Sequence, residues 1–134
     1  MKRDDSLIPT LEGIVEHDPR FKLEGYLFVL SALHFTQSRL PVRRHVTGGE
    51  LLEGIRIYAL DQFGPLARVV LENWGICETL HMGHMVFKLV EHKVLHRTNQ
   101  DSLEDFRTAY DFKEAFDEGW KSTLKTSTQD FLPK

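Results

Sequence analysis

The chain has almost no cysteine and no long hydrophobic run. Cys77 is the only cysteine among 134 residues, so neither an intrachain disulfide nor a zinc site of clustered cysteines can form. No apolar stretch approaches the roughly 20 residues that a membrane-spanning helix needs. The N-terminal run MKRDDSLIPT lacks the apolar core of a secretory signal. We therefore expect a cytoplasmic protein without a membrane partner.

The recognisable motifs of catalysis are also missing. The sequence has no serine elbow, dinucleotide fingerprint or phosphate-binding loop, and the pair Gly48-Gly49 lacks the preceding strand and the lysine that such a loop needs. Cys77 and His81 are one helical turn apart, but a lone cysteine in such a position is more often a small buried apolar residue than a nucleophile. The sequence predicts a protein that is not an enzyme and carries no cofactor.

The chain carries little excess charge, and its acidic residues are concentrated in one segment. The formal net charge is −3. Residues 101–119 alone carry −5, because seven carboxylates stand against Arg107 and Lys113. Such a segment repels the phosphate backbone of a nucleic acid. This charge distribution disfavours a nucleic acid as the partner.

Apolar residues recur at helical spacing along most of the chain. Thr47 and Glu50 have the spacing of a capping box, with the hydroxyl at the N-cap and the carboxylate three residues later. Pro41 ends the preceding helix, since the residue before a proline disfavours the helical conformation. The pattern predicts helices over residues 23–40, 51–63, 65–74 and 80–93.

Residues 65–98 have the pattern of a helix, a tight turn, a second helix and a short extended segment. Gly75 is the predicted end of the first helix, and Thr79 is the predicted N-cap of the second. Phe106, Thr108, Tyr110 and Phe112 then alternate at period two, which favours a strand. Residues 94–98 and 106–112 are therefore expected to form a hairpin.

These elements together favour a mostly α (α+β) fold. We predict a winged-helix-like three-helix unit with a small β-hairpin and an extra N-terminal helix. The length of the chain fits one domain. We place that domain at residues 1–120, followed by a loose C-terminal tail over residues 121–134.

The predicted helix over residues 80–93 has a polar arc. At 100° per residue, His81, His84, Lys88 and His92 fall on the side opposite its apolar residues. In a helix-turn-helix the second helix keeps one face exposed for a partner. We predict a non-catalytic protein-interaction module whose partner is another protein or a second copy of the chain.

A nucleic-acid-binding regulator is the first alternative. Arg39, Arg43 and Arg44 form a small basic connector that would contact phosphates. One lysine and three histidines on the predicted helix face are, however, a poor set for reading base edges.

A metal-binding protein is the second alternative, with His81, His84, His92 and His96 as ligands. Spacings of three and four residues on a helix can bring two imidazoles to one ion. Eight residues separate the two pairs, which is about 12 Å of helical rise. Each pair would therefore need further ligands from elsewhere.

Several runs of the sequence form a recognisable pattern: RRHVTGGELLEGIRIYALDQFGPLARVVLENWGI, VFKLVEHKVL, DSLEDF and YDFKEAF. In these runs the chain resembles an uncharacterised family of small bacterial proteins, from about Glu16 to Phe116. The most recognisable parts are His45 with the capping box, Gln62-Phe63-Gly64-Pro65, Trp74-Gly75-Ile76 and Tyr110-Asp111-Phe112. The resemblance implies a compact domain and no biochemical activity.

Overall fold

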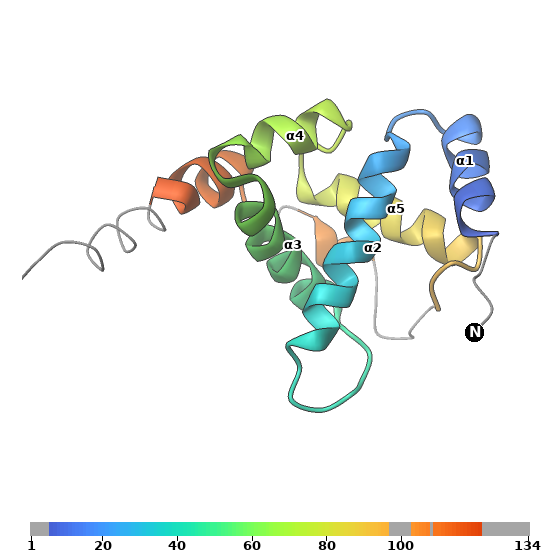
Figure 1. Cartoon of the computed structure of the whole chain (residues 1–134), viewed down its shortest axis with the longest axis horizontal. Coiled ribbons are helices and arrows are strands. Elements are labelled where there is room, and N and C mark those ends of the chain that lie inside the picture. Colours follow the sequence, from blue (N-terminus) through green and yellow to red (C-terminus); the bar gives the residue numbers. More distant parts are fainter. Residues whose placement is uncertain (1–5, 97–102, 108, 122–134) are drawn as a thin grey trace, which may run out of the picture.

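The computed structural model describes residues 6–96, 103–107 and 109–121; the predicted tail over 121–134 lies outside them apart from Lys121. Within the described ranges the chain forms helices joined by loops, with no strand (Figure 1). In chain order the elements are α1 (Leu7–His17), α2 (Leu23–Ser38), α3 (Gly48–Phe63), the 3₁₀ helix η1 (Gly64–Leu66), α4 (Ala67–Asn73), α5 (Thr79–Glu91), the 3₁₀ helix η2 (Leu103–Phe106) and the π-helix η3 (Lys113–Glu118).

The predicted β-hairpin is wrong, and the winged-helix-like fold is wrong with it. Val94 and Leu95 form a bend after α5, and residues 97–98 and Thr108 lie outside the described part of the chain. Phe106 ends η2, and Phe112 directly precedes η3. Both aromatic side chains are buried. Their period-two spacing therefore arises from two separate short helices that each bury a ring, and the described part of the chain is all helical.

α2 and α3 form the centre of the fold, where they cross in close contact (Figure 1). Gly54 of α3 lies directly against Thr36 of α2. The Thr36 hydroxyl donates a hydrogen bond of 2.7 Å to the Ala32 carbonyl in its own helix. Beside this crossing, aromatic rings with centroids 5.4 to 5.7 Å apart join α2 and α3 to the end of α4: Phe28, Tyr58, Phe63 and Trp74.

Local capping signals set two of the helix ends. The predicted capping box of α3 is confirmed, because the Thr47 hydroxyl accepts from the Glu50 N–H at 3.1 Å and the Glu50 carboxylate accepts from the Thr47 N–H at 3.0 Å. Gly75 ends α4 with a φ of +93°. Ile76 then donates to the Leu71 carbonyl at 2.9 Å, the arrangement of a Schellman C-cap.

The predicted N-cap role of Thr79 is wrong. Thr79 is the first residue of α5, and Glu78 at the N-cap makes no side-chain capping bond. The buried Thr79 hydroxyl instead donates to the Phe106 carbonyl at 2.6 Å and accepts from the Ala109 N–H at 3.1 Å. Phe106 is buried, so its carbonyl needs a partner inside the protein, and Thr79 supplies one.

The C-terminal part of the described chain packs back across the helices. The Phe106 side chain lies between Gly48 of α3 and Gly83 of α5. A side chain at Gly83 would collide with it, and one at Gly48 would crowd it. The Tyr110 hydroxyl donates to the Leu52 carbonyl of α3 at 2.9 Å. These contacts attach η2 to the start of α3 and to the first half of α5, and Phe106 also lines the pocket described below.

Candidate functional site

The predicted docking face of α5 is only partly accessible. Nδ1 of His81 accepts a hydrogen bond of 3.1 Å from the Cys77 N–H, and its ring packs on Phe21 with centroids 5.5 Å apart. Lys88 Nζ lies 3.7 Å from the Glu91 carboxylate. Because Phe21 belongs to the connection between α1 and α2, that connection covers the start of this face. A helical wheel of α5 alone does not show this contact.

The rest of the α5 face is half-buried and carries little charge. Burial lowers the pKa of His84, and the positive charge of Arg20 lowers it further. The neutral imidazole is therefore favoured at this position. His92, directly after the end of α5, is also half-buried. Such a face gives a charged partner little to recognise.

The histidines of the metal hypothesis do not all lie on one helix. α5 ends at Glu91, so His96 lies beyond the helix and outside its regular spacing. Among the described residues, no three side chains of His, Cys, Asp or Glu gather closely enough to hold an ion. A metal bound by His81 and His84 would need ligands from outside this part of the chain.

Cys77 is exposed, so the expectation of a small buried apolar residue is wrong, and its described neighbours do not activate it. Partial burial raises the pKa of the Cys77 thiol, and the carboxylates of Glu72 and Glu78 raise it further. His81 accepts from the backbone N–H of Cys77, so its Nδ1 is engaged away from the thiol. The arrangement favours a protonated thiol, which is a poor nucleophile.

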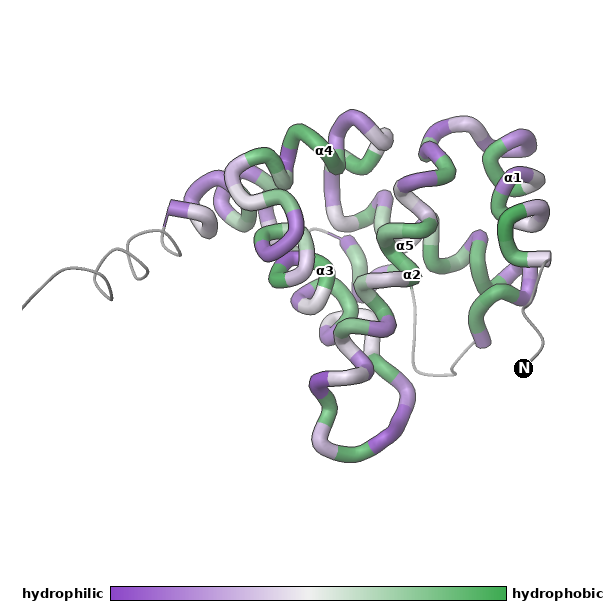
Figure 2. The backbone as a smooth tube through the Cα atoms, viewed as in Figure 1, coloured by the Kyte–Doolittle hydropathy of each residue, from purple (hydrophilic) through white to green (hydrophobic). Residues whose placement is uncertain are grey.

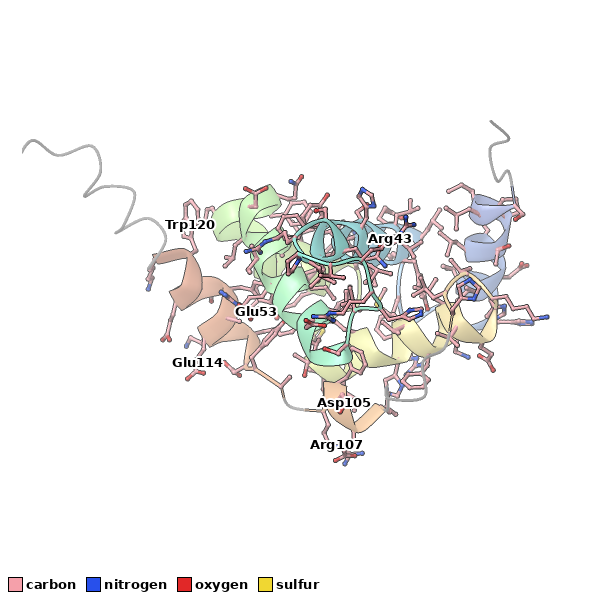
Figure 3. The ribbon with its side chains drawn as sticks, turned by 90° about the horizontal axis from the view of Figure 1, so that it is seen from below. Arg43, Glu53, Asp105, Arg107, Glu114 and Trp120 are labelled. Carbon is pink, nitrogen blue, oxygen red and sulfur yellow. The ribbon has the colours of Figure 1, made fainter. Side chains whose placement is uncertain are left out.

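The three arginines of the basic connector differ in their contacts. Arg44 forms two hydrogen bonds to the Glu50 carboxylate, at 2.8 and 2.7 Å. The guanidinium of Arg39 lies over the Phe35 ring, 5.3 Å from its centroid. Arg43 is exposed, and it makes no ion pair or hydrogen bond within the described part of the chain. Of the three, Arg43 is best placed to bind an external anion (Figure 3).

An apolar pocket lies between α2, the start of α3 and the end of α5. Its volume is about 200 Å³. Leu51 and Phe106 are buried at its base, and Gln37, His45 and His96 are exposed at its mouth. The lining residues are Leu33, Gln37, His45, Val46, Thr47, Gly48, Leu51, Val86, Phe87, Val90, Val94, Leu95, His96 and Phe106.

The C-terminal turn of α5 builds one wall of this pocket. Lys93 adopts a φ of +63°, and the next residue, Val94, donates to the Leu89 carbonyl at 2.8 Å. This is a Schellman C-cap with lysine at the position that glycine usually takes. The reversal brings Val94 and Leu95 back against the helix. The sequence pattern instead predicts a strand at these two residues. Because no glycine marks this turn, the sequence does not reveal the reversal that builds this wall of the pocket.

The loop between α2 and α3 forms the opposite rim. It contains both hydrophilic and hydrophobic residues (Figure 2). Arg44 fixes its shape, because the guanidinium also donates to the His45 carbonyl at 3.0 Å. Val46 then lines the pocket, while His45 stays exposed at the mouth. The pocket can enclose the small apolar part of a ligand and present polar side chains to the ligand's polar groups.

Comparisons with known proteins add no assignment. No family model, curated protein or solved structure matches the chain. The resemblance to a family of small bacterial proteins therefore stays a prediction. Among the described residues, every helix is too short or too polar to cross a membrane.

The rim of the pocket should show a specific acid dependence. Hydrogen bonds from Arg44 and from the Thr47 N–H lower the pKa of Glu50 from 4.5 to about 2. A carboxylate with a depressed pKa stabilises the folded state above its unfolded pKa, and the contribution is lost as the pH falls through the folded value. We expect the wild-type melting temperature to fall between pH 4.5 and about 2, and Glu50→Gln to reduce that fall.

Arg44→Gln is the matching variant, because it removes the donor that acts most strongly on Glu50. Its melting temperature should also depend less on pH over this interval. Thermal melts followed by circular dichroism at a series of pH values measure both effects. If the curves of both variants run parallel to the wild-type curve, the capping carboxylate has no special role in acid stability.

Proposed function

We propose that the protein is a non-catalytic binding domain whose recognition site is the apolar pocket between α2, α3 and α5. The observation that carries this proposal is the pocket itself, which combines an apolar interior with exposed polar side chains at the mouth. Small-molecule sites in proteins typically have this composition. The polar face of α5 is a weaker candidate for the recognition site, since its histidines are half-buried and partly engaged.

The lining supports binding rather than catalysis. His45 and His96 are the only titratable side chains among the lining residues, and both are exposed at the mouth. Residues that would contact an enclosed ligand, such as Leu51, Val86 and Phe106, are apolar. An apolar group in this pocket would be held by exclusion of water, at about 0.8 kcal/mol for each buried methylene.

The volume limits the ligand to a small one. A cavity of roughly 150 Å³ lined by apolar side chains is large enough for benzene, and this pocket measures about 200 Å³. One aromatic ring or a short alkyl chain therefore fits. Phenylacetamide, a neutral molecule with a single ring, is a suitable first probe.

Titration of the isotope-labelled protein with phenylacetamide tests the proposal. Backbone amide signals of Gly48, Val86 and Val94 should shift together, with a dissociation constant of about 1 mM or less, a plausible affinity for a ligand of this size. Val86→Phe places a ring in the pocket and should weaken binding about tenfold or more. Val69→Phe is the matched control, because Val69 lies on α4 with 58% of its surface exposed and does not line the pocket.

Val94→Phe is a second pocket-filling variant in case Val86→Phe folds poorly, and circular dichroism verifies the fold of each. The proposal fails if saturating phenylacetamide moves no signal near the pocket. It also fails if every folded pocket variant binds phenylacetamide as tightly as the wild-type protein does.

A further inference from the structure

We infer that the ligand of this pocket is a small amphipathic carboxylate: its apolar body fills the pocket, and its carboxylate is held at the mouth by Arg43 and His45. The inference rests on the proposed function, because it names the ligand class of the same site.

A second, more open depression adjoins the mouth of the pocket. Gln37 and His45 line both concavities. His34, Arg43 and Arg44 also line the outer depression. None of its lining residues is acidic; they are His34, Gln37, Ser38, Leu40, Arg43, Arg44 and His45. A ligand seated in the apolar pocket can therefore extend toward Arg43, whose positive charge has no carboxylate partner among the described residues.

The neighbouring charges leave Arg43 available to this ligand. Glu50, the nearest carboxylate in sequence, is engaged by both Arg44 and the N-terminus of α3. Glu53, the next, forms a salt bridge with Arg56. No carboxylate of the described chain pairs with Arg43, so an anion from outside is its natural partner.

The carboxylates closest to this site are either engaged or lie beside its enclosed part. Glu50 is bonded to Arg44 and to the Thr47 N–H. Asp105 lies against Gly48, which lines the apolar pocket but not the outer depression. A carboxylate beside Arg43 in the outer depression therefore meets no acidic lining residue.

The pocket closes at its base, which excludes an extended polyanion from the interior. Leu51 is 4% exposed and Phe106 is 1% exposed, and they leave room for one ring or a short chain. A nucleic-acid phosphate could contact Arg43, but it has no apolar body for the enclosed part. The two concavities together match a molecule with one apolar end and one anionic end.

A matched pair of probes isolates the charge. Phenylacetate and phenylacetamide have nearly the same shape, and at neutral pH only the first is charged. We expect phenylacetate to bind the full-length protein about fivefold more tightly, the effect of a favourable exposed ion pair. Added salt should weaken the binding of phenylacetate and leave that of phenylacetamide almost unchanged. Acetate, which has the head group alone, should bind much more weakly than either.

Arg43→Gln should abolish the preference for phenylacetate and leave the dissociation constant of phenylacetamide unchanged. Lys113→Gln removes the same charge from η3, outside both concavities, and should keep the preference. Equal affinities for the two probes in the wild-type protein would overturn the inference while the proposed function stands. A preference that survives Arg43→Gln, or acetate that binds as tightly as phenylacetate, would also overturn it. Binding of neither aromatic probe would refute the proposed function itself.

Discussion

Gly75→Ala should lower the free energy of unfolding by about 3 kcal/mol. Two costs combine at this position. The residue has a φ of +93°, and a side chain in the left-handed region costs about 1 to 2 kcal/mol. A Cβ atom would also collide with the backbone carbonyl of Arg20, and overpacking of this kind typically costs about 1 to 3 kcal/mol. Urea denaturation followed by circular dichroism measures the change.

The collision also predicts where the damage appears. The Lys22 N–H donates to the Trp74 carbonyl at 3.1 Å, so the connection between α1 and α2 is tied to the end of α4. Moving Arg20 away from residue 75 strains that bond. Gly49→Ala is the control, since nothing lies within 4 Å of its added Cβ, and it should change stability by less than about 0.5 kcal/mol. A Gly75→Ala protein as stable as this control would contradict the account.

Gly54→Ala should cost about 2 kcal/mol, although alanine favours a helix. The substitution gains about 1 kcal/mol of helix propensity. Against this, its Cβ would overlap the Thr36 hydroxyl and lie 2.9 Å from the Thr36 Cβ, so α2 and α3 would have to separate. Separation of the central helix pair loses contacts along the whole crossing, which raises the penalty above the propensity gain. Thermal and chemical denaturation both measure it.

A double-mutant cycle with Thr36→Gly isolates this contact. The Thr36→Gly background lacks the three atoms that the new Cβ would meet, so Gly54→Ala should there cost less than about 0.5 kcal/mol. Gly13→Ala on α1, where the added Cβ meets nothing within 4 Å, should instead stabilise the protein by up to about 1 kcal/mol. An equal penalty for Gly54→Ala in both backgrounds would show that the α2–α3 crossing adjusts freely.

Local signals predicted the helices because each signal acts within one or two turns. The helix expected over 23–40 is observed at Leu23–Ser38, and the helix expected over 51–63 is observed at Gly48–Phe63. Thr47 and Glu50 bond to each other's backbone, three residues apart. The information for such a cap is complete in four consecutive residues, so the sequence alone contains it.

The C-terminal region could not be predicted in this way, because distant partners determine it. Phe106 and Phe112 alternate with polar residues as in a strand, yet the partners of Phe106 are glycines on α3 and α5. Thr79 has the residue type and position of an N-cap, but its hydroxyl bonds to the carbonyl of Phe106, which lies 27 residues further along the chain. Tertiary contacts override local preferences in both cases.

The candidate site was the least predictable part. The helical wheel places the polar residues of α5 on one arc, but the sequence gives no sign that Phe21 packs on His81. The pocket depends on a left-handed lysine, Lys93, where the usual glycine signal is missing. Arg43 and Arg44 are adjacent in sequence and have the same side chain, and only the contact with Glu50 distinguishes them.

The position of Phe106 between two glycines has a consequence for the order of folding. α2, α3 and α4 contact elements close to them in sequence, and such local contacts form quickly. The hydrogen bond from Tyr110 to Leu52 closes a loop of 58 residues, which is entropically costlier. On a growing nascent chain, α3 and α5 are complete before Phe106 emerges. We therefore expect the base of the pocket to be sealed in the last kinetic step of folding, so that ligand binding matures only when synthesis has passed η2.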